Sequence, residues 1–325
     1  MKSLNIAIVG TNFISDRFAE AAMAVDGVSL YAVYSRKHET GESFAKRHGI
    51  ERIYTSFDEM LSDSELDAVY VASPTLLHAE QSIAAMKRGK HVLCEKMIAV
   101  THGELVEMRT AAKENRTVLL EAMRPDFDGA FELIRSELPK LGKIRRVSFD
   151  YCQYSSRYDK FKSGEVLNAF DPKLKNSALA DIGIYPLHMC VSLFGEPISL
   201  HSSSIFLKNG FEGAGSVTML YDGMIATVNY SKITDNMSTS VIEGELGSLF
   251  VDKFNAPTKI SVRMRSGEEY AVPFDPSQNN MTFEIEAFRD MIKGKLSCDG
   301  YLDVSDKTLH CVDKIYESSG INKHF

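Results

Sequence analysis

The sequence has few of the residues that would build a disulfide framework or a metal site. Its five cysteines are odd in number and scattered over 325 residues, and no two form a CxxC pair. Neither a disulfide scaffold nor a zinc site is therefore expected. The nine histidines show no HxH or HExxH spacing, so we predict no catalytic metal. Unpaired thiols fit a reducing cytoplasm, which is the predicted location.

Long apolar runs and excess positive charge are also missing. No apolar run approaches the roughly 20 residues that a membrane helix needs. The short apolar stretch after Lys2, residues 6–10, is too brief for the core of a signal peptide. The net charge of -7 does not suggest a surface for nucleic acid or for an anionic membrane. We therefore expect small molecules and further copies of the chain as partners, with no nucleic acid and no membrane.

The composition and patterning indicate a globular protein of two domains. Hydrophobic residues make up 44% and charged residues 25%, which is ordinary for such a protein. Strand and helix patterns alternate through residue 120, which predicts a doubly wound parallel sheet in a dinucleotide-binding domain, residues 1–120. Extended segments then follow one another between residues 198 and 274. This pattern predicts an open, mainly antiparallel sheet in an α/β substrate domain, residues 121–325.

The first apolar run, residues 4–9, is followed by a turn and a helical pattern. The turn resembles the dinucleotide fingerprint G-x-G-x-x-G, with only Gly10 kept. Asn12 replaces the second glycine, and asparagine tolerates positive φ better than most residues. The first amides of the helix would bind a pyrophosphate, although an ordinary strand-to-helix turn is the alternative. The predicted cofactor contacts here are Gly10, Thr11, Asn12, Phe13 and Ile14.

The end of the second expected strand, residues 28–34, bears on cofactor choice. NAD-binding units usually place Asp or Glu there, bonded to the ribose. Here the chain reads Ser35-Arg36-Lys37. Serine and arginine can hold a 2′-phosphate that an acidic residue would repel, so NADP(H) is favoured and NAD(H) is the second choice. A solvated basic loop is the alternative.

A short buried strand then delivers an acid and a base to the edge of the sheet where ligands bind. Val92 and Leu93 read as that strand, and Glu95 and Lys96 follow them. In reduction, the Lys96 ammonium would stabilise negative charge that develops on a carbonyl oxygen. Glu95 would orient Lys96 or contact the cofactor. A surface ion pair is the alternative.

Asp181 and Tyr185 lie four residues apart, which places them on one face of a predicted helix. We predict that both are catalytic, with Tyr185 relaying a proton beside Lys96. The alternative is that Asp181 caps the helix and Tyr185 packs in the core. His188 lies near the same face, although a histidine there is more often a core residue. Substrate contacts are predicted for several polar residues, against the alternative of a solvated loop: Arg124, Tyr154, Arg157, Asn168 and His188.

Several stretches together resemble one protein family, the glucose–fructose oxidoreductase/inositol dehydrogenase (Gfo/Idh/MocA) family. The resemblance covers nearly the whole chain in order, and its most specific part is Gly-Lys-His-Val-x-x-Glu-Lys. It implies a Rossmann domain, an α/β domain whose open sheet often mediates dimerisation, and NAD(P)-dependent oxidation or reduction of sugars, polyols and related carbonyl compounds. The stretches that carry it are residues 10–15, Ala72-Ser73-Pro74 with His78, residues 89–96 and residues 178–185.

The resemblance also assigns residues and exposes departures. Tyr185 stands where inositol dehydrogenase-like members have histidine, as in the dihydrodiol dehydrogenase-like members. Met97 replaces the usual proline, which often follows a cis bond, and Asn176-Ser177 replace Gly-Gly. The cofactor contacts that the resemblance implies beyond the first turn are Ser73, Pro74, Thr75, His78, Glu95 and Lys96.

The leading functional hypothesis is an oxidoreductase that favours NADP(H) and acts on a sugar, a polyol or a small carbonyl compound. We expect a homodimer or larger assembly through the uncovered face of the second sheet. Two alternatives stay open: a non-catalytic protein that senses dinucleotides or sugars on the same fold, and an NAD-dependent glycosidase. The joint presence of Lys96, Asp181 and Tyr185 favours the oxidoreductase.

Overall fold

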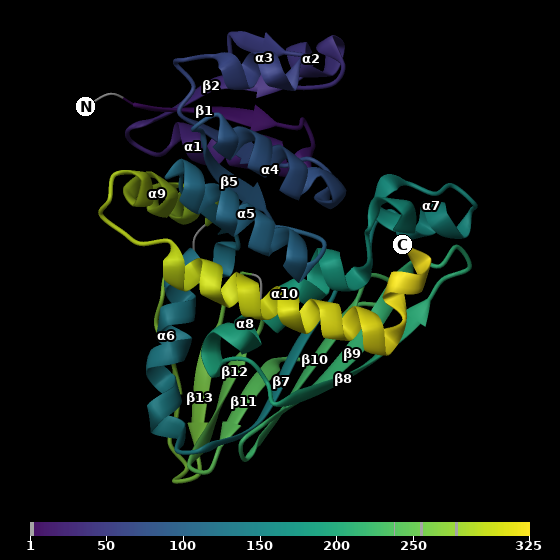
Figure 1. The fold of residues 1–325 in the computed structure, drawn as a ribbon. Helices are drawn as coiled ribbons and strands as arrows, with labels where there is room; N and C mark the ends of the chain where they lie inside the picture. The colour runs from purple at the N-terminus through teal and green to yellow at the C-terminus, as the bar shows by residue number, and fades with distance from the viewer. Residues whose placement is uncertain (1–2, 237, 254–255, 277–278) are drawn as a thin grey trace. The chain divides into compact units, whose positions relative to one another are not determined.

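The computed structural model describes residues 3–236, 238–253, 256–276 and 279–325. The chain forms two compact units, each drawn as part of the ribbon in Figure 1. The first unit contains Met1–Phe127 and Gln278–Asp306, and the second contains Asp128–Ser277 and Lys307–Phe325. The division differs from the predicted one, because a segment late in the chain groups with the first unit instead of the second.

The first unit is built on a six-stranded parallel sheet in the order β3-β2-β1-β4-β5-β6. The predicted doubly wound parallel sheet is therefore confirmed. The strand order reverses between β1 and β4, and ligands of such sheets bind at the carboxyl ends of the strands beside this point. The strands are β1 (Leu4–Val9), β2 (Val28–Tyr34), β3 (Arg52–Tyr54), β4 (Ala68–Val71), β5 (His91–Glu95) and β6 (Leu119–Ala122).

Helices complete this unit and bury its apolar strands. Every residue of β4 is buried, as expected for a parallel strand covered on both faces. Tyr70 of β4 stacks on Phe18 with ring centroids 3.6 Å apart. The helices are α1 (Phe13–Met23), α2 (His38–His48), α3 (Phe57–Ser62), α4 (His78–Lys87), α5 (His102–Asn115), α9 (Met281–Ile292) and the start of α10 (Asp299–Ser319).

Helix α9 is the late segment that joins the first unit. Met281, Ile285 and Phe288 recur at spacings of four and three residues, so they share one helix face. All three are completely buried in the same core cluster as Ile6 and Ile8 of β1. The periodicity of α9 is visible in the sequence, but its place on the first sheet is set by packing between residues far apart in the chain.

The second unit contains an eight-stranded sheet in the order β14-β13-β12-β11-β7-β10-β9-β8. Only the central pair β7 and β10 is parallel, so the predicted mainly antiparallel sheet is confirmed. The strands are β7 (Ile144–Cys152), β8 (Ser199–Phe206), β9 (Glu212–Tyr221), β10 (Met224–Ser231), β11 (Ser240–Gly244), β12 (Gly247–Val251), β13 (Ile260–Met264) and β14 (Glu269–Ala271).

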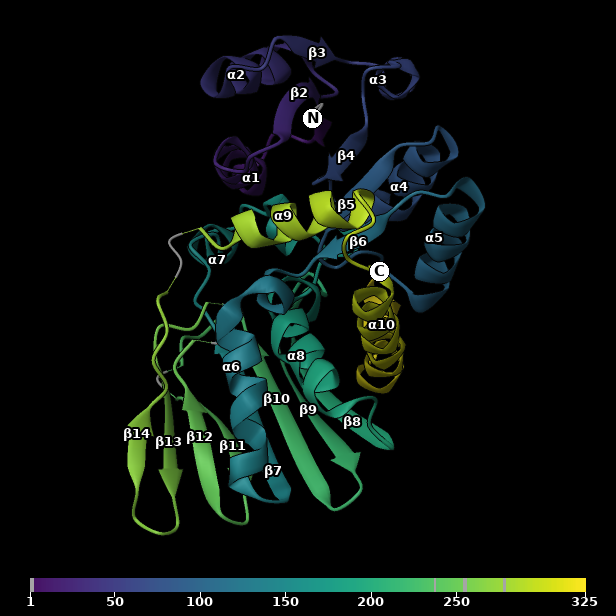
Figure 2. The same ribbon diagram turned by 90° about the vertical axis from the view of Figure 1, so that its left-hand side faces the viewer.

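Helices α6 (Gly129–Glu137) and α8 (Ile184–Phe194) lie over one face of this sheet (Figure 2). Strand β10 alternates accordingly, with Val228 and Tyr230 buried toward the helices. The opposite face carries aliphatic side chains that are about half exposed, but polar residues lie between them. The exposed aliphatic residues are Ile205 (60%), Leu220 (45%) and Ile225 (48%), and the polar ones include Ser203, Thr218 and Asn229.

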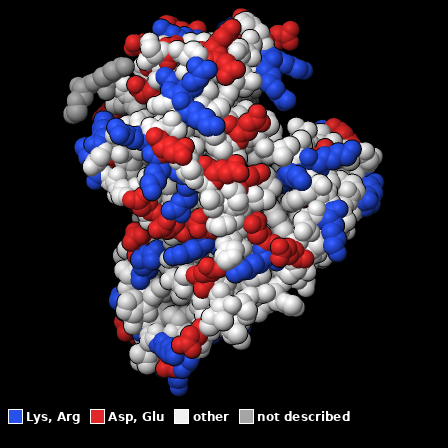
Figure 3. All heavy atoms as spheres, viewed as in Figure 1, with Lys and Arg blue, Asp and Glu red and all other residues white. Residues whose placement is uncertain are grey.

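The short helix α7 (Tyr158–Lys162) lies in the long polar stretch before Asp181. Basic side chains are prominent around α7 on the face shown in Figure 3, but acidic partners lie beside them. Lys160 pairs with Glu165 and Lys162 pairs with Asp159. Among the described residues, no helix combines the length and apolar character needed to cross a membrane, and no cluster of His, Cys, Asp and Glu is arranged to hold a metal ion.

Candidate active site

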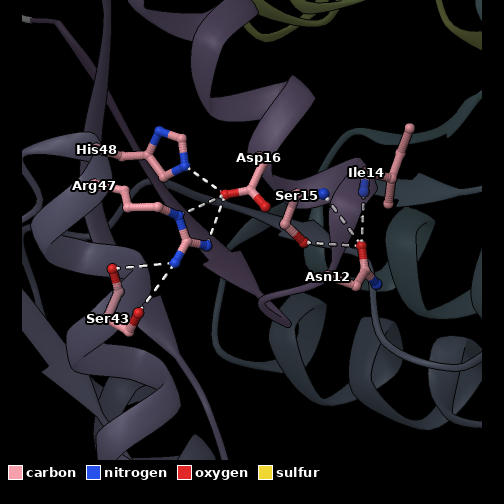
Figure 4. Close-up of polar contacts among 7 residues, drawn as sticks. All are labelled: Asn12, Ile14, Ser15, Asp16, Ser43, Arg47 and His48. Carbon is pink, nitrogen blue, oxygen red and sulfur yellow. Dashed lines mark hydrogen bonds and ion pairs between the residues drawn. The ribbon is translucent and has the colours of Figure 1, made fainter.

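The turn after β1 depends on Gly10 and Asn12. Gly10 has φ +111°, and a Cβ there would lie 2.8 Å from the Ala72 carbonyl oxygen, so only glycine fits. The place of Asn12 in the fingerprint suggested a positive φ. Its backbone is instead extended, with φ -89°. Its Oδ1 accepts hydrogen bonds from the amides of Ile14 (2.9 Å) and Ser15 (3.2 Å), as Figure 4 shows.

Asn12 is therefore the N-cap of α1. The side-chain nitrogen of Asn12, Nδ2, also donates a hydrogen bond to the Ala72 carbonyl at 2.7 Å. This bond connects the start of α1 to the residue after β4. We expected the first amides of α1 to be available to a pyrophosphate. Those of Ile14 and Ser15 are already bonded to Asn12, so the turn offers fewer amides than the fingerprint suggested.

An ion-pair cluster fixes α1 against α2 (Figure 4). Asp16 Oδ1 lies 2.8 Å from Arg47 Nη2 and 2.7 Å from His48 Nε2. Burial alone would raise the pKa of Asp16, but the bonds from His48 and Arg47 outweigh it and hold this pKa below its usual range. The cluster fixes the position of the helix that begins directly after the predicted 2′-phosphate residues.

Those residues differ in how accessible they are. The Ser35 side chain is buried, and its Oγ lies 2.6 Å from Thr40 Oγ1 in the first turn of α2. Arg36 and Lys37 are exposed beside it. Of the two predicted ligands for a 2′-phosphate, Arg36 is thus the accessible one, whereas Ser35 contacts the start of α2.

The segment after β4 contains Ser73, Pro74 and Thr75 and leads into α4, whose first residue is His78. His78 has a different setting from the one expected. Its ring is buried, with Nδ1 2.8 Å from the Met97 carbonyl and Nε2 2.8 Å from the Ser73 carbonyl. Burial lowers the pKa of His78, although both backbone contacts act in the opposite direction. Because both ring nitrogens contact backbone, any effect of this side chain on a cofactor passes through the two loops that it joins.

The acid at the end of β5 is held in place by buried neighbours. Glu95 accepts a hydrogen bond from the Tyr70 hydroxyl at 2.5 Å and one from the Lys96 amide at 3.2 Å. Burial raises the pKa of Glu95, while Tyr70, Lys96 and Arg124 oppose that shift. Glu95 therefore contacts the backbone of Lys96 directly. Whether it orients the lysine side chain or contacts the cofactor remains a prediction.

The backbone after Lys96 is fixed by buried side chains as well. The Lys96–Met97 peptide bond is cis. The next amide, that of Ile98, donates to Glu121 Oε1 at 2.9 Å, and Glu121 Oε2 accepts a bond from Ser305 at 2.6 Å. Lys96 itself is half-buried at the start of this loop. The surroundings thus hold the main chain on both sides of the lysine.

In the second unit, Asp181 lies in a π-helical turn, Leu179–Gly183, that leads directly into α8 and Tyr185. Such turns occur frequently at functional sites. Ser177 Oγ accepts a hydrogen bond from the Ala180 amide at 3.0 Å at the start of this turn. The half-exposed Asp181 carboxylate pairs with Lys232 at 2.8 Å. Tyr185 is 5% exposed, with its ring 6.0 Å from that of Tyr151.

The buried carboxylate of Glu212 accepts a hydrogen bond from the first residue of this turn. Glu212 accepts bonds from the Leu179 amide (2.9 Å), the Tyr230 hydroxyl (2.8 Å) and Ser204 (3.0 Å). Burial raises the pKa of Glu212 although these donors oppose the shift. The Tyr230 ring packs so closely that a Cβ on Gly183 would lie 2.6 Å from it. The close packing at Gly183 and the Glu212 bonds fix the turn against the sheet.

The other predicted substrate residues lie in varied surroundings. Arg124 is 8% exposed in the first unit and donates to Asn280 at 3.3 Å. His188 is completely buried with Nδ1 3.4 Å from Thr308 Oγ1, which agrees with the core alternative. The Tyr154 hydroxyl donates to Asp159 and accepts from Lys162 at the surface. Arg124 and His188 are buried, whereas Arg157 and Asn168 are exposed. Substrate contact by each of them remains a prediction.

Comparison with known proteins identifies the family. Residues 4–122 match the model of an oxidoreductase family with an NAD-binding Rossmann fold, and residues 131–250 match the GFO/IDH/MocA C-terminal domain. The chain is 43% identical over 292 residues to scyllo-inositol 2-dehydrogenase (NADP(+)) IolU of Bacillus subtilis, which covers 89% of this chain and 88% of that protein.

This chain is a member of the Gfo/Idh/MocA family. The resemblance in the sequence is thus confirmed, and the chain is an NAD(P)-dependent oxidoreductase. It is also 36% identical to the uncharacterised oxidoreductase YgjR of Escherichia coli, over 98% of this chain and 97% of that protein. The fold matches levoglucosan dehydrogenase in complex with NADH and levoglucosan, with a TM-score of 0.88 at 20% identity over 100% of this chain and 98% of that one.

One departure from the Gfo/Idh/MocA pattern has a local explanation. Asn176 and Ser177 stand in place of two glycines, and both side chains form hydrogen bonds. The Asn176 side chain donates to the Asn168 carbonyl at 2.7 Å, and Ser177 Oγ accepts a hydrogen bond from the Ala180 amide. These bonds hold the segment that leads into the π-helical turn.

Sequence reasoning missed Lys232, Glu212 and Tyr230, which surround the turn that carries Asp181. No motif marks them. The available signal was weak: one charged residue at the start of a strand, Glu212 in β9, and another directly after the following strand, Lys232 after β10.

Proposed function

We propose that this protein is an NADP(H)-preferring dehydrogenase that interconverts a secondary alcohol and a ketone on an inositol or a related cyclic polyol. The observation that supports it most is 43% identity, over 89% of the chain, to a scyllo-inositol 2-dehydrogenase whose name specifies NADP(+). The exposed Arg36 at the end of β2, where an acidic residue would favour NAD, points to the same cofactor.

The residues at the carboxyl ends of β1, β2 and β4 fit such a cofactor. Gly10 carries no side chain in the turn, and any Cβ there would meet the Ala72 carbonyl, so the main chain stays bare where a pyrophosphate approaches. Arg36 would hold the 2′-phosphate through charge-assisted hydrogen bonds. The dinucleotide, when bound, accepts or supplies the hydride.

Lys96, Tyr185 and Asp181 supply the remaining chemistry in this proposal. In reduction, the Lys96 ammonium stabilises negative charge on the carbonyl oxygen, and the Tyr185 hydroxyl gives that oxygen its proton. Asp181 accepts a hydrogen bond from a neighbouring substrate hydroxyl. Oxidation runs the same proton transfers in reverse, so the alcohol loses one proton from oxygen and one hydride from carbon.

A substrate panel tests the proposal. Oxidation of scyllo-inositol and myo-inositol would be followed with NADP⁺ and with NAD⁺, beside the reduction of ketoses and dicarbonyls with NADPH. We expect turnover of a cyclic polyol with a higher kcat/KM for NADP⁺. NADPH binding without turnover of any panel member would favour the sensing alternative. NAD⁺-dependent hydrolysis of a nitrophenyl glycoside would favour the glycosidase alternative.

We also propose a homodimer or larger assembly through the face of the second sheet opposite α6 and α8. Leu220 and Ile225 are paired in the sheet register and exposed on this face, and Ile205 lies on the edge strand β8. Light scattering at micromolar concentration would show a dimer or larger species, and the double variant Leu220→Lys/Ile225→Lys would shift it toward monomer. A monomeric wild type would contradict the proposal.

A further inference from the structure

Lys232 is a buried lysine that neither the family pattern nor the mechanism above accounts for. It directly follows β10, and its side chain is only 5% exposed. Its Nζ lies 4.9 Å from the ring centroid of Phe170 and 5.4 Å from that of Phe211. Both rings belong to a compact aromatic cluster with Phe161. Lysine is almost never buried to this extent unless it is paired, so its partners indicate what it does.

Two of those partners come from segments near the proposed substrate residues. Lys232 Nζ donates to the Ala169 carbonyl at 3.0 Å and pairs with Asp181 Oδ2 at 2.8 Å. The Lys232 backbone is also fixed, since its amide donates to Gly213 and its carbonyl accepts the Ser155 amide, both at 2.9 Å. The lysine thus links the end of β10, the polar stretch before Asp181 and the π-helical turn.

The ion pair is asymmetric in its exposure to solvent. The Asp181 side chain is 48% exposed, whereas the Lys232 side chain is 5% exposed. The group that solvent or a substrate meets is therefore the carboxylate, with the cation beneath it. A carboxylate accepts hydrogen bonds strongly from hydroxyl groups and repels anions.

We infer that Lys232 is a specificity-determining positioning residue, which aims the Asp181 carboxylate at a substrate hydroxyl. The arrangement selects neutral polyols over substrates that carry a carboxylate or a phosphate at that position. This inference rests on the proposed function, because it assigns Asp181 to substrate binding. It adds a residue that acts through Asp181 without touching the reacting atoms.

The first test compares Lys232→Met with wild type, using scyllo-inositol, myo-inositol and deoxyinositols with NADP⁺. In Lys232→Met the Asp181 carboxylate loses the partner that holds its orientation, so KM for the inositols should rise roughly 10- to 100-fold. The same variant should change kcat by less than about 3-fold. Deoxyinositols that lack the bonded hydroxyl should be affected far less. Lys232→Arg should restore part of the loss, and the affinity for NADPH, measured by fluorescence, should stay unchanged.

Lys208→Met is the matched control. Lys208 is exposed and lies 5.5 Å from the ring of Phe161 in the same aromatic cluster, so this change removes a cation from the cluster and leaves the Asp181 pair intact. Its KM should match wild type. An unchanged KM in Lys232→Met, or an equal rise for inositols and all deoxyinositols, would overturn the inference. Absence of inositol turnover in wild type would instead count against the proposed function.

The second test needs no substrate. Asp181→Asn leaves a buried ammonium without its counter-charge, whereas Lys232→Met leaves a carboxylate that is already half exposed to water. Thermal unfolding should therefore show a clearly larger loss of Tm in Asp181→Asn than in Lys232→Met. Equal losses, or the opposite order, would show that the pair is not built around a buried cation.

Discussion

Two segments of the molecule carry the proposed catalytic groups, and their support is similar in one respect and opposite in another. In the first unit, Glu121 accepts the amide of Ile98 beyond Lys96, and in the second unit Glu212 accepts the amide of Leu179 before Asp181, both at 2.9 Å. A buried carboxylate therefore fixes the backbone in both segments. Directional bonds to charged acceptors of this kind are among the stronger hydrogen bonds in proteins.

The charges on the side chains are reversed between the two segments. In the first unit, half-buried Lys96 lies beside Glu95, which is 7% exposed. In the second unit, exposed Asp181 lies against Lys232, whose side chain is 5% exposed. In each segment, a more accessible charged residue therefore has a buried neighbour of the opposite charge type: Glu95 next to Lys96 along the chain, and Lys232 in an ion pair with Asp181. The comparison teaches that the setting of each accessible group depends on the buried residue beside it.

The largest effect is expected when the more accessible charge of the first segment, the half-buried Lys96, is removed. Lys96→Met should lower kcat by roughly 10²- to 10³-fold, because it removes the ammonium that stabilises negative charge on the carbonyl oxygen. Steady-state kinetics with NADP⁺ and a polyol from the panel would measure the loss, and NADPH binding by fluorescence would show that the fold is retained. Full activity in Lys96→Met would refute the proposed mechanism.

Tyr185→Phe tests whether the second segment acts together with Lys96. It removes one hydroxyl, so the loss of kcat should be smaller than in Lys96→Met, roughly 10- to 100-fold. The double variant should lose less than the product of the two single losses, because groups that act as a unit are not additive. Wild-type kcat in Tyr185→Phe would indicate Asp181 or His188 as the proton relay instead.

The preference for NADP(H) over NAD(H) tests the cofactor-binding residues of the first unit. Arg36→Ala should weaken NADPH binding by roughly 10- to 150-fold, the value of a charge-assisted hydrogen bond, and change NADH binding little. Titration of both dinucleotides would measure this. Lys46→Ala, at an exposed position in α2, is the control and should bind like wild type. Equal losses for both cofactors, or a wild type that prefers NADH, would contradict the assignment.

The smallest expected effect concerns the buried carboxylate of the second unit. Glu212→Gln replaces an acceptor oxygen with a donor amide, which should cost about 1–3 kcal/mol of stability. Because burial raises the pKa of Glu212 above 4.5 in the folded protein, its contribution to stability is present at low pH and is lost as pH rises through the folded pKa. Glutamine does not titrate, so this pH dependence should disappear.

Unfolding midpoints in denaturant, measured across pH, would show this for wild type and Glu212→Gln. Glu245→Gln removes a carboxylate from an exposed ion pair with Arg145 and serves as the control. A pH dependence that persists unchanged in Glu212→Gln would exclude Glu212 as its source.

The first unit was more predictable from sequence than the second, for a physical reason. Apolar strands, turn glycine and helix caps are local patterns, so the strand before Gly10 and the strand before Glu95 could be read from adjacent residues. Asn12 was misread because a cap and a positive φ favour the same residue type. The difference between them lies in a backbone angle that sequence does not specify.

The support of the second segment could not be predicted in this way. A lysine that ends a strand usually reaches solvent, and nothing near Lys232 in the sequence indicates Asp181 as its partner. Glu212 likewise looks like a surface residue until the Leu179 amide and Tyr230 are folded onto it. These contacts join residues that are distant in sequence, so they depend on the assembled sheet.

The return of α9 to the first sheet has a consequence for how the protein is made. Met281, Ile285, Phe288 and Met291 complete the same core as the strands near the N-terminus. During synthesis the ribosome releases those strands first, and domains usually fold in that order. Here the dinucleotide-binding unit cannot complete its core until α9 has emerged, so the apolar residues that α9 covers stay exposed until then. We expect fragments that end before Met281 to lack part of this core and therefore to unfold more readily than chains that include α9.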